Sequence, residues 1–211
     1  MSDLPPYLSL SERIWYYAFR ILCGAIFFFL VFPLVVIIPL SFNAVPFFTF
    51  TKEMLAFDPA GYSLKWYEDF FTNLNWQGAV QNSVIIAIFS TLISTTLGTL
   101  AALGLSRAQM PYRTLIMSIL ISPMIVPLII SAAGMFFFYS RIGIQGTHIA
   151  VILAHAALGT PFVVITVTAT LSGFDNNLIR ASSSLGAPPS TTFFRVIVPL
   201  ITPGVISGAL F

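Results

Sequence analysis

The chain has 211 residues, of which 57% are hydrophobic and only 8% are charged. A soluble domain carries about 25% charged residues, so this chain has too few polar side chains to cover a water-soluble globule. The composition excludes a soluble globular protein and indicates an integral membrane protein.

Stretches without charge locate the expected membrane spans. Asp, Glu, Lys and Arg are absent from residues 21–51, 70–106, 114–140, 142–174 and 196–211. A transmembrane helix needs about 20 mainly apolar residues, whereas transmembrane strands would alternate polar with apolar residues, which these stretches do not. We therefore predict an all-α membrane protein. Its expected helices lie near residues 19–41, 79–105, 114–138, 148–172 and 196–211.

The distribution of basic residues orients the expected bundle. Cytoplasmic segments of membrane proteins carry an excess of Lys and Arg, and that rule is met here if the N-terminus is cytoplasmic. The inner segments then carry Arg13, Arg20, Arg107, Arg113, Arg180 and Arg195, against Lys52, Lys65 and Arg141 outside. This predicts a cytoplasmic segment at 1–18, a transmembrane region at 19–211, a periplasmic loop at 42–78 and a cytoplasmic loop at 174–195. The chain is expected to end within its fifth span.

The long outer loop contains the aromatic, amphipathic sequence YSLKWYEDFF at residues 62–71. One interpretation is a helix at the membrane interface, anchored by Trp66 and Tyr67. The other is a docking site for an external partner, and the pattern leaves both open.

Small residues and prolines recur within the spans. Gly204 and Gly208 have the spacing that lets two helices approach closely, which indicates either close packing or a sliding surface in a gated pore. Prolines at positions such as Pro127 and Pro161 each remove a helix hydrogen bond and tend to kink the helix.

The residues argue against catalysis by this chain. Lys52 and Lys65 lack the glycine-rich sequence of a phosphate-binding loop, so the chain is not expected to bind ATP in that way. His148 and His155 have no nearby carboxylate or cysteine to complete a metal site. No acid lies within a span, which disfavours a hydrolase and a proton-coupled carrier. We expect no enzyme activity, no cofactor in this chain and an external source of energy.

Polar residues in the spans are candidates for lining a transport pathway. The second expected span has more hydroxyl groups than packing requires. An alternative is that these hydroxyls bond back to their own helix. The alternative for His155 is that it is a polar packing residue. The candidates are Asn82, Ser83, Thr91, Ser94, Thr95 and His155.

The polar stretch RASSSLGAPPSTTFFRVIVPL at residues 180–200 separates two apolar runs. We predict two short helices joined at Gly186, because glycine suits a left-handed position after a helix and proline suits a first turn. Such an element at the cytoplasmic surface is either a docking element or an ordinary interfacial amphipathic helix.

This stretch resembles the EAA loop of ABC-importer permeases, in which Glu-Ala-Ala is followed by a glycine and a hydrophobic-x-Leu-Pro ending. The matching residues are 180–182, Gly186 and 197–199. The sequences NSVIIAIFSTLISTTLGTLAALGLSR, SPMIVPLII, AHAALGTPFVV and LSGFDNNLIRASSSLGA resemble the spermidine/putrescine-type branch, and the likeness covers about residues 60–211. Arg180 replaces the glutamate of the family, and Ser182 replaces its second alanine.

The resemblance implies the type I ABC-importer transmembrane fold, also called MetI-like, with about five of an expected six spans present. It implies a multi-pass permease in a bacterial inner membrane, a polyamine-like cation or an aminophosphonate as solute, and Mg-ATP bound by partner subunits. The implied partners are two cytoplasmic ATPases, a second permease subunit that is a homologous but different chain, a periplasmic binding protein and the lipid bilayer, with no nucleic acid. Residues implied in coupling are Leu178, Arg180, Ala181, Ser182, Leu185, Gly186, Ala187, Phe193, Phe194 and Pro199. The alternatives are a self-contained secondary carrier or channel, and a non-transporting assembly protein.

Overall fold

The structure is a computed structural model that describes residues 7, 9–107, 109–175 and 177–211. It is built from helices, and among the described residues the only β-type pairing is an isolated bridge between Asn43 and Tyr62. The all-α prediction is therefore confirmed. The chain forms two compact units, Met1–Gln77 and Gly78–Phe211, and each is described by itself.

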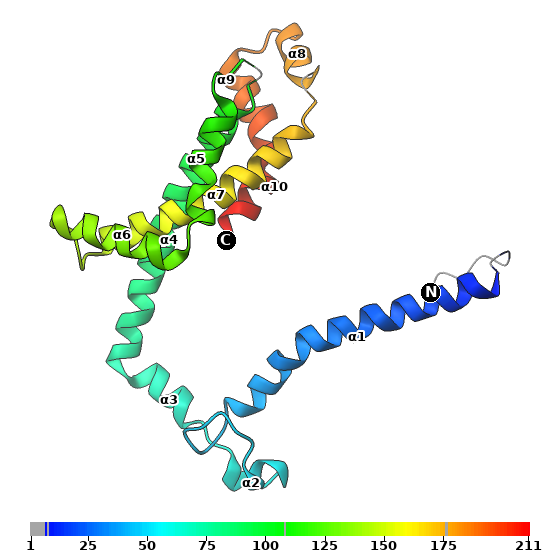
Figure 1. Ribbon diagram of the computed structural model, residues 1–211, viewed down its shortest axis with the longest axis vertical. Coiled ribbons are helices and arrows are strands. Elements are labelled where there is room, and N and C mark those ends of the chain that lie inside the picture. The colour runs from blue at the N-terminus through cyan, green and yellow to red at the C-terminus, as the bar shows by residue number, and fades with distance from the viewer. Residues whose placement is uncertain (1–6, 8, 108, 176) are drawn as a thin grey trace. The chain divides into compact units, whose positions relative to one another are not determined.

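The helices are shown in chain order in Figure 1. The first unit contains α1 (Leu10–Leu40), α2 (Lys52–Leu55), the 3-10 turn η1 (Pro59–Gly61) and α3 (Lys65–Thr72). Then come α4 (Leu74–Leu105), α5 (Arg113–Ile125), α6 (Leu128–Arg141), α7 (His148–Ser172), α8 (Asn177–Ser184), α9 (Pro189–Thr192), the π-helical turn η2 (Phe193–Ile197) and α10 (Val198–Ala209).

The length and composition of the helices agree with the expected spans. Among the described residues four helical stretches are long and apolar enough to cross a membrane, namely Leu10–Leu40, Leu74–Leu105, His148–Ser172 and Pro189–Ala209. The α5–α6 pair gives a fifth if it is counted as one broken span.

The prediction of one continuous helix over 114–138, kinked at its prolines, is wrong. The chain forms α5 and α6 instead, which are bent by 99° at the break between them. Val126 takes an extended conformation, with φ −69° and ψ 132°, because a residue that precedes proline is disfavoured in the α region. Pro127 also has no N–H to donate to the preceding turn. The proline therefore ends the first helix instead of only kinking it.

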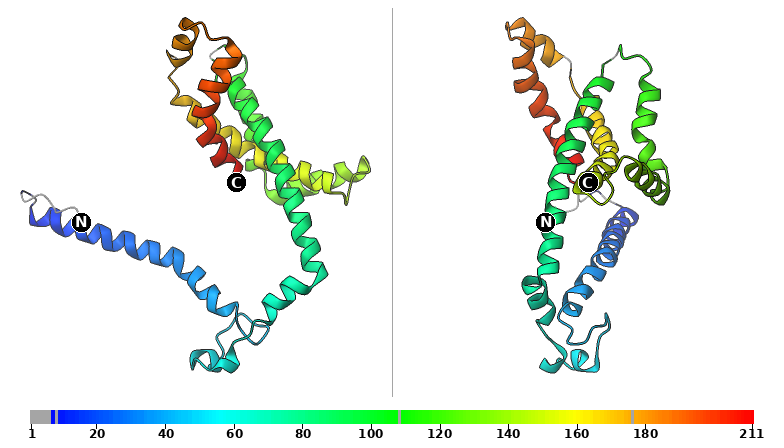
Figure 2. Two further views of the ribbon diagram at one scale, coloured as in Figure 1. Left: turned by 180° about the vertical axis from the view of Figure 1, so that it is seen from behind. Right: turned by 90° about the vertical axis from the view of Figure 1, so that its left-hand side faces the viewer.

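The core of the second unit lies where α7 meets α4 and α10. Ala102 of α4, Val163 and Val167 of α7, and Ile201 of α10 form one buried cluster. Figure 2 shows these three helices packed together from two further sides. Their polar neighbours bond to their own helix, as Thr166 Oγ1 does to the carbonyl of Phe162 at 3.0 Å. Bonds of this kind satisfy polar groups within a helix, as an apolar medium requires.

Glycines allow the close approach of these helices. A Cβ atom at Gly98 of α4 would lie 2.6 Å from Cβ of Val163, and one at Gly208 of α10 would lie 2.8 Å from Cα of the same valine. Gly204, one turn before Gly208, would meet the side chain of Thr170. Close packing at Gly204 and Gly208 is therefore confirmed.

We predict that Gly208→Ala destabilises the second unit, because the added methyl group would press on the backbone of Val163. Overpacking of this kind costs about 1–3 kcal/mol. Gly134→Ala is the matched control, since Gly134 also lies inside a helix but has nothing within 4 Å of its would-be Cβ. Thermal unfolding of the detergent-solubilised chain measures the effect. Equal unfolding midpoints for the two variants would contradict the packing argument.

Candidate functional site

The 177–199 segment forms a helix–turn–helix element at one end of the second unit, as Figure 1 shows. Gly186 ends α8 with a left-handed φ of +77°. Its N–H bonds to the carbonyl of Ser183 at 3.0 Å, and the N–H of Ala187 bonds to the carbonyl of Ser182 at 3.1 Å. These two bonds define a Schellman motif, whose left-handed position favours glycine. The predicted glycine turn between two short helices is confirmed.

The second half of the element leads directly into the last apolar helix. Pro189 occupies the first turn of α9, as predicted, because a proline there loses no helix hydrogen bond. The chain then passes through the π-helical turn η2, where the N–H of Val198 bonds to the carbonyl of Phe193. Pro199 lies in the first turn of α10. A π-turn of this kind often marks a functional position in a helix.

A side-chain hydrogen bond joins the two halves across the turn. The hydroxyl oxygens of Ser182 on α8 and Thr192 on α9 lie 2.8 Å apart, and Thr192 is only 5% exposed. The residue at 182 departs from the alanine of the EAA pattern, and its hydroxyl is the atom that makes this bond. Thr192 was not predicted as a site residue, because no local pattern signals a partner ten positions away.

The outer surface of the element is apolar at several points. Leu185 is 87% exposed and Phe194 is 68% exposed. Phe193 is half-buried and meets the ring of Phe194 edge-on, with ring centroids 5.1 Å apart. Leu178, Arg180 and Ala181 are exposed on α8, Ala187 is half-buried and Pro199 is exposed. The element therefore presents large apolar side chains and two cations, Arg180 and Arg195, to its surroundings.

The pathway candidates on α4 fall into two groups. Asn82 and Ser83 are exposed near the start of the helix, and the amide oxygen of Asn82 lies 3.0 Å from Nε2 of His148 on α7. Ser94 is buried, donates to the carbonyl of Thr91 at 3.2 Å and faces Gly159 of α7. In this conformation Ser94 thus lies within a helix contact.

The remaining candidates lie in partly open positions. Thr91 and Thr95 are half-buried, and Oγ1 of Thr95 is enclosed without a hydrogen-bond partner, like those of Thr99 and Thr168. His155 is exposed on α7 and lines a cavity of about 380 Å³ together with Met135 of α6. The hydroxyls of Thr99 and Thr168 and the His148–Asn82 contact were not foreseen from the sequence. Among the described residues, no group of three His, Cys, Asp or Glu side chains is placed to hold a metal ion.

We predict that Ser182→Ala loosens α8 from α9. Loss of one hydrogen bond costs about 1 kcal/mol, roughly a fivefold change in an opening equilibrium, and it leaves Thr192 buried without its partner on α8. Amide hydrogen exchange should therefore accelerate in α8 and α9. Ser184→Ala is the control, because the Ser184 hydroxyl is exposed and bonds to the Arg180 carbonyl of its own helix. Identical exchange in the two variants would show that the Ser182–Thr192 bond does not hold the element together.

Comparison with known proteins gives concordant results. Residues 94–211 match the family model described as binding-protein-dependent transport system inner membrane component. The chain is 30% identical over 185 residues to the spermidine/putrescine transport system permease protein PotC of Haemophilus influenzae, covering 88% of this chain and 69% of that one. It is also 30% identical over 184 residues to PotC of Escherichia coli strain K12, covering 87% and 67%.

The fold is also found in a solved structure. A bacterial ABC transporter involved in the import of the acidic polysaccharide alginate superposes with a TM-score of 0.68 at 17% identity, over 98% of this chain and 71% of that one. This likeness confirms the transmembrane fold of ABC importers. Family model, relatives and fold agree, and the chain belongs to the family of binding-protein-dependent transport system inner membrane components, the permeases of ABC importers.

Proposed function

We propose that this permease moves a small polyamine-like cation, delivered by a periplasmic binding protein, across the bacterial inner membrane into the cytoplasm. The observation that supports this solute is the 30% identity to spermidine/putrescine permeases over most of the chain. The spans supply no acidic ligand, because residues 70–106, 114–140, 142–174 and 196–211 contain no Asp or Glu. Recognition of the cation then rests on aromatic and carbonyl groups in the pathway and on the binding protein.

The proposed orientation follows the distribution of basic residues. Arg107 follows α4 and Arg113 begins α5, whereas Arg180 lies within α8 and Arg195 within η2. All four would face the cytoplasm, together with the N-terminal segment 1–18. The loop 42–78 would face the periplasm, where the binding protein arrives. This arrangement satisfies the positive-inside rule.

The helix–turn–helix element at 177–199 is the proposed docking site for a cytoplasmic ATPase. It presents Leu185 and Phe194, which are 87% and 68% exposed, to fill an apolar groove on that partner. Arg180 is exposed beside them and would meet an acidic residue or the C-terminus of a helix, since cations are favoured there. Two ATPases would serve a pair of permease chains and bind the Mg-ATP, so this chain itself is not an enzyme.

The element is well placed to transmit motion to the spans. The Ser182–Thr192 bond of 2.8 Å ties α8 to α9, and α9 continues through η2 into α10. Closure of the ATPases around ATP would displace this element and tilt α7 and α10. The pathway would then open outward to accept the solute, and hydrolysis would return it to the inward-facing state.

We expect transport by the reconstituted complex to require ATP and to be uncoupled by Gly186→Val. Valine at the left-handed φ of Gly186 is strained by about 1–3 kcal/mol, which deforms the docking turn while the spans still insert. Gly143→Val is a matched control, because Gly143 has a φ of +76° and, like Gly186, nothing within 4 Å of its would-be Cβ. It lies in the α6–α7 turn and not in the docking element.

The measurements are co-purification with the ATPase and ATP-dependent uptake of spermidine into vesicles. Loss of both in Gly186→Val, with Gly143→Val near the unmodified level, supports the docking role. If the two variants show similar co-purification and similar uptake, that role is refuted. Uptake that needs neither ATP nor a second polypeptide would instead establish a secondary carrier or channel.

We also propose that Asn82, Ser83, Thr91, Thr95 and His155 line part of the solute pathway. The prediction is that cysteines at Asn82 and Ser83, introduced after Cys23→Ala, react with a water-soluble thiol reagent in the assembled complex. Cysteine at Ser94 is the internal comparison, because Ser94 is only 6% exposed. It should react slowly, or only in a nucleotide state that separates α4 from α7. If positions 82 and 83 react no faster than 94 in every nucleotide state, they do not line a water-filled pathway.

A further inference from the structure

A rigid turn follows the end of α1 and presents two phenylalanines. The side chain of Asn43 is only 1% exposed. Its amide nitrogen donates to the carbonyls of Phe47 and Thr49 at 2.9 and 2.8 Å, and its amide oxygen accepts the N–H of Val45 at 2.9 Å. This one buried side chain therefore fixes the shape of the 43–49 turn, at whose tip Phe47 and Phe48 are 68% and 83% exposed.

Other aromatic residues contact this turn and its flanking residues. Nε1 of Trp66 donates to the carbonyl of Asn43 at 2.8 Å. The hydroxyl of Tyr67 lies 2.7 Å from that of Ser41, and its ring stacks on Phe42 with centroids 5.2 Å apart. The polar ends of Trp66 and Tyr67 thus bind within the protein. They position the turn, whereas the rings of Phe47 and Phe48 remain largely exposed.

The turn forms one wall of an apolar groove of about 770 Å³. Ile37 and Leu40, at the end of α1, form another part of its lining, and Phe70 and Phe71 of α3 complete it. Whichever solvent surrounds the end of α1, lipid or water, therefore also reaches this groove.

The length and composition of α1 indicate that this solvent is lipid. Within the first unit no residue of α1 is buried, and residues 21–40 carry no charge. At a rise of about 1.5 Å per residue, this stretch is about 30 Å long, which equals the hydrocarbon thickness of a bilayer. Arg20 marks one boundary, with its guanidinium bonded to the hydroxyl of Tyr16 at 2.6 Å. The groove at Leu40 consequently lies at the opposite membrane interface.

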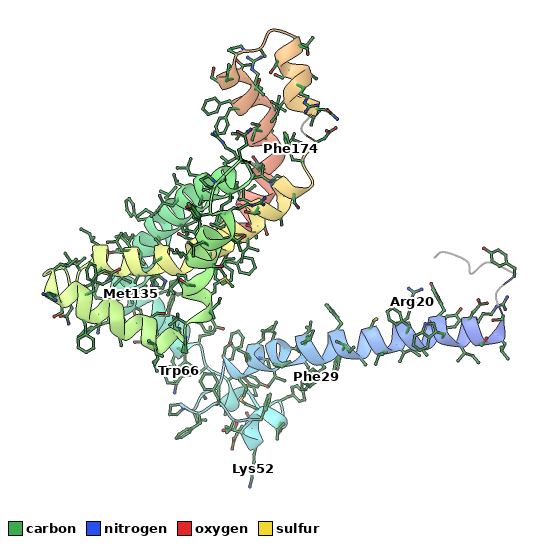
Figure 3. The ribbon with its side chains drawn as sticks, turned by 45° about the horizontal axis from the view of Figure 1, so that its top comes forward. Arg20, Phe29, Lys52, Trp66, Met135 and Phe174 are labelled. Atoms are coloured by element: carbon green, nitrogen blue, oxygen red, sulfur yellow. The ribbon has the colours of Figure 1, made fainter. Side chains whose placement is uncertain are left out.

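We propose that this groove binds the acyl chain of a phospholipid in the leaflet around the end of α1, with Phe47 and Phe48 inserted beside it as an interfacial anchor. Aromatic side chains concentrate at this depth in membrane proteins, and an apolar patch of this kind marks an interaction site. The charged residues Lys52, Glu53 and Asp58 lie on α2 and the turn that follows it. Figure 3 shows Lys52 projecting away from α1, while Trp66 lies beside the end of that helix.

Depth measurements with a nitroxide label test the proposal. Single cysteines are introduced at Phe48 and at Phe71 of the groove in the Cys23→Ala chain, which is reconstituted in dioleoylphosphatidylcholine vesicles. Phe57 is the matched control, because it is the same residue type in the same unit, is 85% exposed and precedes the charged Asp58. We expect the ratio of oxygen collisions to nickel-chelate collisions to be several-fold higher at 48 and 71 than at 57.

A second variant tests the role of Asn43. Asn43→Ala should lower the collision ratio at position 48 toward that at 57, while a label at Leu30 of α1 keeps its lipid value and reports that the helix is still inserted. Equal collision ratios at 48, 71 and 57 in the chain that keeps Asn43 would overturn the proposal. It would also be overturned if positions 48 and 71 became protected only after addition of the second permease subunit or the binding protein. The inference does not depend on the solute or on ATPase docking. The proposed function and the lipid site can therefore fail independently of each other.

Discussion

The arrangement of the second unit depends on the close approach of three helices at Val163. Gly98 of α4 and Gly208 of α10 both face this one residue, and a Cβ at either glycine would lie within 2.8 Å of it. In a membrane the lipid is as apolar as the side chains, so helices associate through close van der Waals packing at small residues. The orientation of α10 against α7 therefore follows from glycine positions, and the element between these two helices is placed by the same contact.

That element combines a rigid turn with an irregular helix. The Schellman bonds at Gly186 and the Ser182–Thr192 bond fix α8 against α9, whereas η2 interrupts regular α-helical bonding just before α10. The α8–α9 pair can therefore move as one rigid body relative to α10, because the irregular turn η2 absorbs the change in backbone angles. The substitution of alanine by Ser182 is consistent with such stiffening, since the hydroxyl adds a bond across the turn. Nothing in the structure explains why arginine replaces glutamate at position 180.

The first unit contains an irregular loop whose shape depends on one buried side chain. Asn43 satisfies three backbone groups of the turn, which removes the cost of leaving these polar groups unpaired. Trp66 and Tyr67, expected from their residue type to anchor an interfacial helix or to dock an external partner, also bind backbone and hydroxyl groups of the protein. Phe47 and Phe48 are the most exposed aromatic side chains of the turn, and they have no polar atom to satisfy.

The sequence alone determined the class of protein, the position of the spans, the glycine turn at Gly186 and the family, because each depends on composition or on residues close together in the chain. It also located the prolines of the α5–α6 region, but one helix was expected where Pro127 ends α5 and the next helix departs at 99°. A proline removes a hydrogen bond whatever its surroundings, whereas neighbouring helices decide whether the helix continues past it. Only the tertiary structure placed Ser94 inside the α4–α7 contact, joined Ser182 to Thr192 and Asn82 to His148, and made Asn43 the centre of its loop. Each of these pairings depends on how separate segments pack, and the local pattern of residue types carries no signal for a partner supplied by another segment.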